Sequence, residues 1–266
     1  MAALSDGQIG IVNLGLRPYE EMSAAQETLV EARRNGEIRD LLLVLEHPPT
    51  YTRGRRTDPG DLLYGPDELT ERGIEVCDTP RGGKVTYHGP GQLVIYPIVD
   101  LRGIGEQPGS TDRIDVAGFV ATLEGAMSAA LAGRGIDAAP IEGLTGLWVS
   151  HGDPIPPDAT AASMGGKVAT GKVAKIGSIG LRINRGISSH GLSLNVSCDL
   201  QPFEGITSCG IEHCRVSSIE SETGSAPPVA EAGSDVGSFL AEGLGLEPVP
   251  LEPAGIGLET TAPATA

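Results

Sequence analysis

The sequence predicts an α+β (mixed α/β) fold that forms one domain. Short apolar runs typical of strands and amphipathic helical segments follow one another through most of the 266 residues, with no internal repeat. The composition agrees, since Gly 38 and Pro 20 supply many turns and aromatic residues make up only 3%. We therefore expect a core built mainly from Val, Ile, Leu and Ala.

The N-terminal part predicts a strand, a helix and a second strand. Residues 8–14 form the first apolar run, and residues 19–34 follow a helical period that ends at Asn35-Gly36. The apolar side chains on that helical stripe are Met22, Ala25, Leu29 and Ala32. Residues 41–46 (LLLVLE) are apolar without alternation, which indicates a strand buried on both faces and ended by the following prolines.

The middle of the chain predicts four more strands and a second helix. Residues 74–77 and 93–101 are strand-like. Asp112 can cap a helix that runs to Leu131, because an apolar stripe continues until the next glycines. Residues 144–149 and 173–183 should be paired strands, joined by a loop longer than about 20 residues that we expect to be mobile.

The C-terminal part predicts a strand at residues 190–196 and an amphipathic helix after Pro228. From residue 247 onward Pro, Ala, Thr and Glu follow one another without periodicity. We therefore expect a domain at residues 1–246 and a disordered tail at residues 247–266.

The charge argues against several classes of protein. Lys plus Arg number 19 against 35 Asp plus Glu, a net charge of −16, so no positive field exists to bind nucleic acid. The N-terminus lacks the features of a signal peptide, no apolar run reaches the length of a membrane span, and the four cysteines form no C-x-x-C pair. We expect a cytoplasmic protein that neither enters a membrane nor binds nucleic acid.

Basic side chains are locally enriched between residues 167 and 195, where no acidic residue occurs. They are Lys167, Lys172, Lys175, Arg182 and Arg185. This surplus predicts a docking or catalytic surface.

Two glycine-containing stretches carry polar side chains. EHPPTYTRG (46–54) is by itself most simply the end of a strand and a turn. RGGKVTYHGPGQ (81–92) contains four glycines among Arg, Lys, Tyr, His and Gln, which lets the backbone approach a ligand closely. A tight turn that supports the core is an equal alternative, and neither the phosphate-loop nor the dinucleotide-binding pattern is matched.

A lysine and a cysteine are the candidates for covalent chemistry. Lys175 lies near the start of a strand among small apolar residues, where desolvation favours the neutral amine, although most lysines at strand ends are solvated. Cys209 lies between Ser208 and Gly210 in a turn, and a nearby Lys or His would raise its thiolate fraction and accept its proton. Cys77 and Cys198 fit buried positions better.

Cys209, His213 and Cys214 are the candidate ligands of a zinc site. Structural zinc sites use four ligands in paired spacing, and no matching second pair follows. We expect no metal.

The stretches EHPPTYTRG, RGGKVTYHGPGQ, KIGSIGLRI and SSHGLSLNVSCDL followed by FEGITSCGI together resemble the lipoyl(octanoyl) transferase family. The resemblance runs from about residue 8 to about residue 245. It implies a fold similar to biotin and lipoate protein ligases, with a mixed β-sheet flanked by helices. It also implies transfer of octanoyl from octanoyl-acyl carrier protein to a lysine of apo lipoyl domains through an acyl-cysteine thioester, the first step of lipoate biosynthesis, without a cofactor.

The resemblance assigns roles to individual residues. Cys209 matches the acyl-accepting thiol and Lys175 its partner, in preference to Lys172, because Lys175 keeps KIGSIGLRI free of gaps. The expected acyl pocket is lined by Arg81, Gly82, Gly83, Lys84, Val85, Thr86, Tyr87, His88, Ser178, Ile179, Gly180, His190, Gly191 and Leu192. The segment 150–172 and the C-terminal tail depart from the family pattern.

The partners implied are octanoyl-acyl carrier protein and the lipoyl domains of 2-oxoacid dehydrogenase complexes and of the glycine cleavage H protein, with the enzyme acting as a monomer. Carrier proteins are acidic, so Arg53, Arg55 and Arg56 together with the basic run 167–185 offer a matching surface.

Two alternatives remain open. An ATP-dependent lipoate-protein ligase of the same fold would use Lys175 to bind an adenylate. A non-catalytic module that binds the carrier protein would leave Cys209 unacylated.

Overall fold

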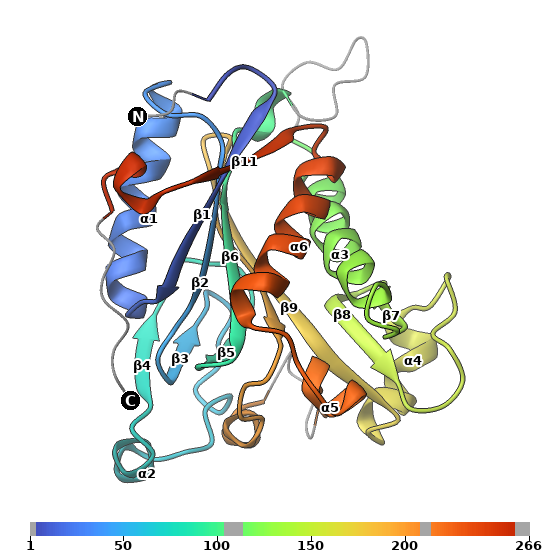
Figure 1. The fold of residues 1–266 in the computed structure, drawn as a ribbon. Helices are drawn as coiled ribbons and strands as arrows, with labels where there is room; N and C mark the ends of the chain where they lie inside the picture. The colour runs from blue at the N-terminus through green and yellow to red at the C-terminus, as the bar shows by residue number, and fades with distance from the viewer. Residues whose placement is uncertain (1–3, 104–113, 208–213, 259–266) are drawn as a thin grey trace.

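The structure is a computed structural model that describes residues 4–103, 114–207 and 214–258 (Figure 1). Within these residues one eight-stranded sheet has the order β11-β1-β2-β6-β10-β9-β8-β7, and a smaller sheet has the order β4-β3-β5. The large sheet is made of β1 (Gln8–Leu16), β2 (Leu41–Glu46), β6 (Gln92–Ile98), β7 (Ala138–Ile141), β8 (Leu144–Ser150), β9 (Val173–Asn184), β10 (Ile187–Asn195) and β11 (Glu247–Leu251). The small sheet is made of β3 (Thr50–Arg53), β4 (Glu75–Asp78) and β5 (Val85–His88).

The large sheet is mixed, because β11, β1 and β2 run parallel while the remaining pairs are antiparallel. The helices are α1 (Tyr19–Arg34), α2 (Pro66–Glu71), α3 (Val116–Ala132), α4 (Ala161–Ala169), α5 (Ile219–Thr223) and α6 (Val229–Gly243). Figure 1 shows α3 and α6 side by side on one face of the sheet and α1 on the other. The expected mixed sheet flanked by helices is confirmed.

The core has one layer on each face of the sheet, and β2 contributes to both. Leu42 and Val44 pack in the cluster under α3 and α6, whereas Leu41, Leu43 and Leu45 pack in the cluster under α1. Successive strand residues point to opposite faces, so a strand covered on both sides needs an unbroken apolar run. The run LLLVLE therefore lies where its composition predicted.

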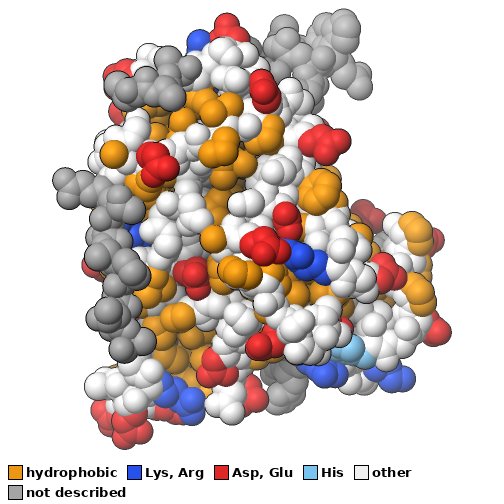
Figure 2. Space-filling view, viewed as in Figure 1, with side chains coloured by type: hydrophobic (Ala, Val, Ile, Leu, Met, Phe, Trp, Pro, Cys, Tyr) orange, Lys and Arg blue, Asp and Glu red, His pale blue; other side chains and the backbone are white. Residues whose placement is uncertain are grey.

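The charge of the chain is visible on its surface. Figure 2 shows acidic side chains spread over the whole face in view, with few basic ones among them. This agrees with the net charge of −16.

The expectation of a disordered tail from residue 247 is wrong for residues 247–258. Strand β11 pairs in parallel with β1, from Gln8 opposite Glu247 to Val12 opposite Leu251, and a 3-10 turn follows at Pro253–Ile256. Pro248 and Pro250 argued against a strand at the level of sequence. An edge strand tolerates them because one side of its backbone makes no ladder hydrogen bonds. The domain therefore extends past residue 246, while residues 259–266 lie outside the described part.

The segment expected to be a mobile loop between β8 and β9 contains helix α4. Thr160 and Ser163 form a capping box at its start, and the side chains of its residues Met164 and Val168 are buried. Two glycines within the helix weakened its signal in the sequence. Helix α3, which precedes α4 in the chain, also differs from expectation at its start. It is capped by Asp115, whose side chain accepts from the Gly118 N–H, while Asp112 lies outside the described residues.

Candidate active site

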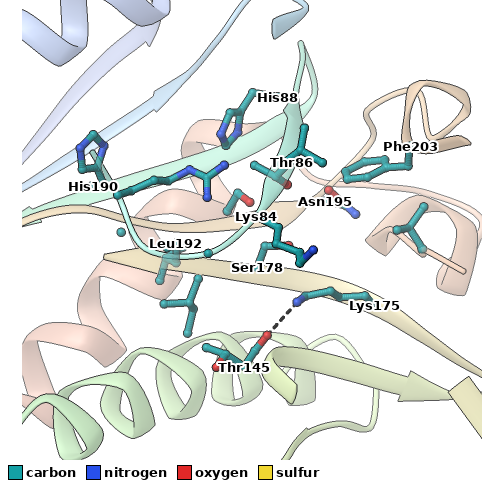
Figure 3. A pocket seen from close by; sticks show the side chains of 18 of the residues that line it. Lys84, Thr86, His88, Thr145, Lys175, Ser178, His190, Leu192, Asn195 and Phe203 are labelled. Atoms are coloured by element: carbon teal, nitrogen blue, oxygen red, sulfur yellow. Dashed lines mark hydrogen bonds between the residues drawn. The ribbon is translucent and has the colours of Figure 1, made fainter. Parts of the chain in front are cut away.

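A cavity of about 270 Å³ lies between the glycine-rich segment 81–88 and the strands β9 and β10. All of the residues expected to line the acyl pocket are in its wall except Gly82 and Tyr87, and Lys175 lies in the wall as well. In Figure 3, His190 lies at one end of this cavity, and Lys175 and Phe203 lie at the other. The structure thus brings together three stretches that are far apart in the chain.

Tyr87 and Gly82 serve the surrounding framework. The Tyr87 ring packs edge-on against Tyr51 and Phe203 in the small-sheet core, and burial raises the pKa of its hydroxyl to about 12. Its neighbours Thr86 and His88 point to the opposite face of β5 and line the cavity. The Gly82 N–H donates to the Leu181 carbonyl at 2.8 Å, which joins the glycine-rich segment to β9.

Lys175 is the third residue of β9 and is only 5% exposed. Its Nζ donates to the Thr145 carbonyl oxygen at 2.7 Å, as Figure 3 shows, and lies 5.1 Å from the centre of the Trp148 ring. The expectation that Lys175 lies near the start of a strand is confirmed.

Cys209 lies outside the described residues, but the chain on both sides of it is anchored beside the cavity. Before it, the Thr207 N–H donates to the Asp61 carbonyl at 2.8 Å. After it, the Lys175 N–H donates to the Arg215 carbonyl at 2.8 Å, and the Ser217 N–H donates to the Lys175 carbonyl at 2.9 Å. The flanking chain thus meets the backbone of the candidate lysine.

His88 is held in one tautomer by a neighbouring amide. The Gln92 Nε2 donates to Asn195 Oδ1 at 2.9 Å and to the Tyr87 carbonyl at 3.1 Å, so its Oε1 accepts from His88 Nδ1 at 2.7 Å. Burial lowers the pKa of His88 well below its usual range, with the nearby His47 adding to the effect. His88 is therefore neutral, and its Nε2 is an acceptor.

His190 adopts an unusual backbone conformation at the other end of the cavity. Its φ is +54°, a region that few residues other than glycine occupy. Its N–H donates to Gln26 Oε1 of α1 at 2.6 Å. Burial lowers the pKa of His190 to about 4, and the positive charges of Arg81 and Arg182 contribute.

Two buried histidines predict a dependence of stability on pH. Burial lowers the pKa of both His47 and His190 to about 4, whereas an unfolded histidine titrates near ~6.5. The unfolded chain binds more protons between these values, so the free energy of unfolding should fall as the pH drops from about 6.5 towards 4, by on the order of 1 kcal/mol per pH unit for each histidine. Urea unfolding at several pH values measures this slope.

The control for this prediction is His190→Asn, because asparagine tolerates a positive φ. This variant should show a shallower loss of stability on acidification than the parent chain. An identical slope in the two chains would contradict the contribution of His190.

Arg81 shapes the glycine-rich segment. Its buried guanidinium donates to the Thr52 carbonyl at 2.6 Å, to Thr52 Oγ1 at 2.7 Å and to the Gly82 carbonyl at 2.9 Å. The backbone N–H groups of Arg55 and Arg56 donate to the Arg81 and Gly83 carbonyls. The stretches 46–54 and 81–92, which are separate motifs in the sequence, are therefore joined by hydrogen bonds in the structure.

Of the basic residues expected to offer a surface, Lys172 and Arg185 are exposed and Lys167 is half-buried. Lys175 is buried, and Arg182 lies 3.9 Å from Glu27. Arg53 pairs with Asp78 at 2.8 Å. Arg55 and Arg56 are exposed, and Arg56 also lines the cavity.

Several cavity residues were not identified from the sequence. They are Tyr19, Tyr96, Gly143, Leu144, Thr145, Ser193, Asn195, Phe203 and Val216. Ser193 and Asn195 lie in the motif SSHGLSLNVSCDL, and Phe203 begins FEGITSCGI, so these motifs were the available signal for the three residues. The others lie in segments with no unusual composition.

Among the described residues, no group of three or more His, Cys, Asp or Glu side chains is arranged to hold a metal ion. Within the same ranges, no helix is both long and apolar enough to cross a membrane. Cys209 and His213, two of the candidate zinc ligands, lie outside the described residues.

Comparison with known proteins shows which family this mixed sheet and its lysine-containing cavity belong to. The chain belongs to the family described as lipoyl protein ligase A/B catalytic domain, whose model matches residues 18–238. It is 40% identical over 240 residues to the octanoyltransferase of Chloroflexus aggregans, covering 90% of this chain and 96% of the relative. It is 38% identical over 236 residues to an octanoyltransferase of a Mycobacterium species, covering 89% of this chain and 85% of the relative.

Solved structures agree on the fold. The archaeal bipartite lipoate protein ligase of Thermoplasma acidophilum superposes with a TM-score of 0.64 at 15% identity, covering 92% of this chain and 87% of that one. A lipoate-protein ligase A bound with ATP gives a TM-score of 0.60 at 15% identity, covering 93% and 89% of the two chains. The expected similarity to lipoate ligases is confirmed for the fold.

Proposed function

We propose that this chain is an octanoyltransferase that moves an octanoyl group from octanoyl-acyl carrier protein to a lysine of an apo lipoyl domain. The observation that carries this function is the identity of about 40% with octanoyltransferases over nearly the whole chain. The cavity supports it, because Val85, Ile179 and Leu192 supply an apolar lining beside Lys175. Burial of an acyl chain on such a lining is worth ~0.8 kcal/mol per CH₂.

In the proposed first half-reaction, Lys175 takes the proton of the Cys209 thiol. The thiolate then attacks the thioester carbonyl of the donor, a new C–S bond to Cys209 forms, and the C–S bond to the carrier breaks. The departing carrier thiolate takes the proton from the Lys175 ammonium. One thioester replaces another, so the step is nearly isoenergetic.

In the proposed second half-reaction, the amine of the acceptor lysine attacks the acyl-cysteine carbonyl. A C–N bond forms, the C–S bond to Cys209 breaks, and Lys175 relays the amine proton to the Cys209 sulfur. The products are an octanoyl amide and the free thiol of Cys209. Formation of an amide from a thioester drives the reaction forward without ATP.

The mass of the intact protein tests this function. Incubation with octanoyl carrier protein, without ATP, should add one octanoyl group to the parent chain and none to Cys209→Ser. When an apo lipoyl domain is added afterwards, the octanoyl group should leave this chain and appear on the lipoyl domain. Labelling only with free octanoate and ATP would identify a ligase instead, and no labelling under either condition would favour the non-catalytic module.

The exposed Arg55 and Arg56 lie beside the cavity and are suited to an acidic carrier protein. We expect that replacing both by Glu lowers the kcat/KM for octanoyl carrier protein about tenfold or more at low salt, because charge reversal turns attraction into repulsion. A small octanoyl thioester should be used almost as well as by the parent chain. Equal slowing with both donors would contradict docking at these arginines.

The proposed acceptors are the lipoyl domains of 2-oxoacid dehydrogenase complexes and of the glycine cleavage H protein, with the enzyme acting as a monomer in the cytoplasm. The free thiols of Cys77 and Cys198 support a reducing compartment.

A further inference from the structure

Strand β8 holds the Lys175 side chain through several contacts. Trp148 of β8 lies directly opposite Lys175 of β9 in the sheet, so the two side chains share a face. The ammonium donates to the Thr145 carbonyl at 2.7 Å and lies 5.1 Å from the Trp148 ring centre. A carbonyl oxygen and the face of an indole both attract a positive charge.

A register shift in β9 turns Lys175 towards the cavity. Leu147 pairs with Gly177, but the next residue, Trp148, pairs with Lys175, which leaves Ile176 as an extra residue. Lys175 and Ser178 are three positions apart and would point to opposite faces of a regular strand. The shift places both in the cavity wall.

Gly146 leaves the space that the lysine side chain occupies. Its φ is +114°, and a Cβ added there would lie 2.8 Å from Lys175 Cε, 3.0 Å from Lys175 Nζ and 2.5 Å from the Gly177 carbonyl oxygen. The Gly146 N–H donates at 2.8 Å to a carboxylate oxygen of Glu124, which anchors this turn to helix α3. A side chain at position 146 would therefore displace the lysine amine.

The Trp148 side chain is held in place by its own contacts. It is fully buried, and its Nε1 donates to the Leu144 carbonyl at 2.9 Å. It packs in a cluster that includes Met164 and Val168 of α4. The inserted segment 150–172 thus supplies part of the wall that keeps the Trp148 ring in place.

From these contacts we propose that Gly146 and Trp148 are positioning residues, which keep the Lys175 amine in one place while it accepts and returns protons. The inference rests on the proposed role of Lys175 as the proton acceptor for Cys209. A free lysine side chain samples many rotamers, and a displacement of about 1 Å from the reacting atoms can lower a rate on the order of a hundredfold. Substrate binding should be unaffected, because neither residue is needed to hold the acyl chain.

The first test compares two glycine substitutions. Gly146→Ala should lower the single-turnover rate of Cys209 acylation at saturating octanoyl carrier protein by about tenfold or more, with KM changed less than about twofold. The matched control is Gly135→Ala, where φ is also positive, at +77°, but no atom lies within 4 Å of the added Cβ and the residue is not in the cavity wall. Gly135→Ala should acylate at the parent rate.

A double-substitution cycle separates positioning from a general loss of structure. Because the effect of Gly146→Ala passes through the lysine, it should vanish when it is added to Lys175→Ala. A further tenfold loss in that background would overturn the proposal.

The second test uses Trp148 and applies even if Gly146→Ala does not fold. Trp148→Phe keeps an aromatic face beside the ammonium and should retain most of the acylation rate per folded molecule. Trp148→Leu keeps an apolar side chain without that face and should lose about tenfold. Equal rates for the two folded variants would overturn the role of the ring.

The role of Lys175 and the positioning role of Gly146 and Trp148 can be contradicted separately. If Lys175→Ala acylates Cys209 as fast as the parent chain, the proposed function of the lysine is wrong. If Lys175→Ala is slow while Gly146→Ala and Trp148→Leu are both fast, the function stands and the positioning role is wrong.

Discussion

Replacement of Lys175 by Ala is expected to lower the rate of Cys209 acylation by about 10²–10⁴, the usual contribution of a positioned acid or base. A free thiol with a pKa near ~8.5 is only a few per cent thiolate at neutral pH, so loss of the proton acceptor slows the attack on the donor thioester. The measurement is single-turnover appearance of the octanoyl group by intact mass, with the donor saturating.

Lys175→Arg is the informative partner of this substitution. It keeps a positive charge near the Thr145 carbonyl and the Trp148 ring, but a guanidinium does not give up its proton. If proton transfer is the function of Lys175, Lys175→Arg should be nearly as slow as Lys175→Ala. Recovery of the parent rate by Arg would show that the charge alone is needed.

Replacement of Gly191 by Ala is expected to destabilise the protein by about 3 kcal/mol, at the upper end of the cost of overpacking. A Cβ at this position in β10 would lie 2.2 Å from the Ile95 carbonyl oxygen and 2.5 Å from Pro97 Cδ of the neighbouring strand β6. The carbonyl is backbone in the middle of a paired sheet, so it cannot move away without breaking strand hydrogen bonds. Urea unfolding at neutral pH measures the loss.

The matched control is Gly125→Ala in helix α3, where no atom lies within 4 Å of the added Cβ. This substitution should stabilise the chain by ~0.5–1 kcal/mol, because alanine has the higher helix propensity. A similar change in stability at the two positions would contradict the steric argument for Gly191.

Local patterns predicted the elements whose burial is regular. Helix α1 begins and ends at the expected residues, since its apolar period lies within the segment and its Asn35-Gly36 stop follows directly. Strand β2 was predicted for the same reason, because burial on both faces requires an uninterrupted apolar run. These signals depend only on neighbouring residues.

Elements that depend on a distant partner were missed or misassigned. Strand β11 carries two prolines and little apolar surface, so only its pairing with β1, more than 200 residues away in the chain, makes it a strand. Helix α4 contains Gly165 and Gly166, and it is stabilised by burial of Met164 and Val168 rather than by propensity.

The candidate site divides in the same way. The motifs pointed to Lys175, His88 and His190, and the structure brings these residues to one cavity. The motif could not tell that Tyr87 faces the small-sheet core while His88 faces the cavity, because that depends on which side of β5 is covered.

The sequence by itself determined the family, the candidate nucleophile Cys209 and its candidate partner Lys175, because residue types in a long ordered series of motifs carry that information without coordinates. Only the tertiary structure decided how Lys175 is held. Its carbonyl and indole contacts come from β8, and the space for its side chain comes from Gly146, which lies 29 positions earlier in the chain. Contacts of this kind depend on strand register and on one extra residue in β9, and neither can be deduced from composition or spacing.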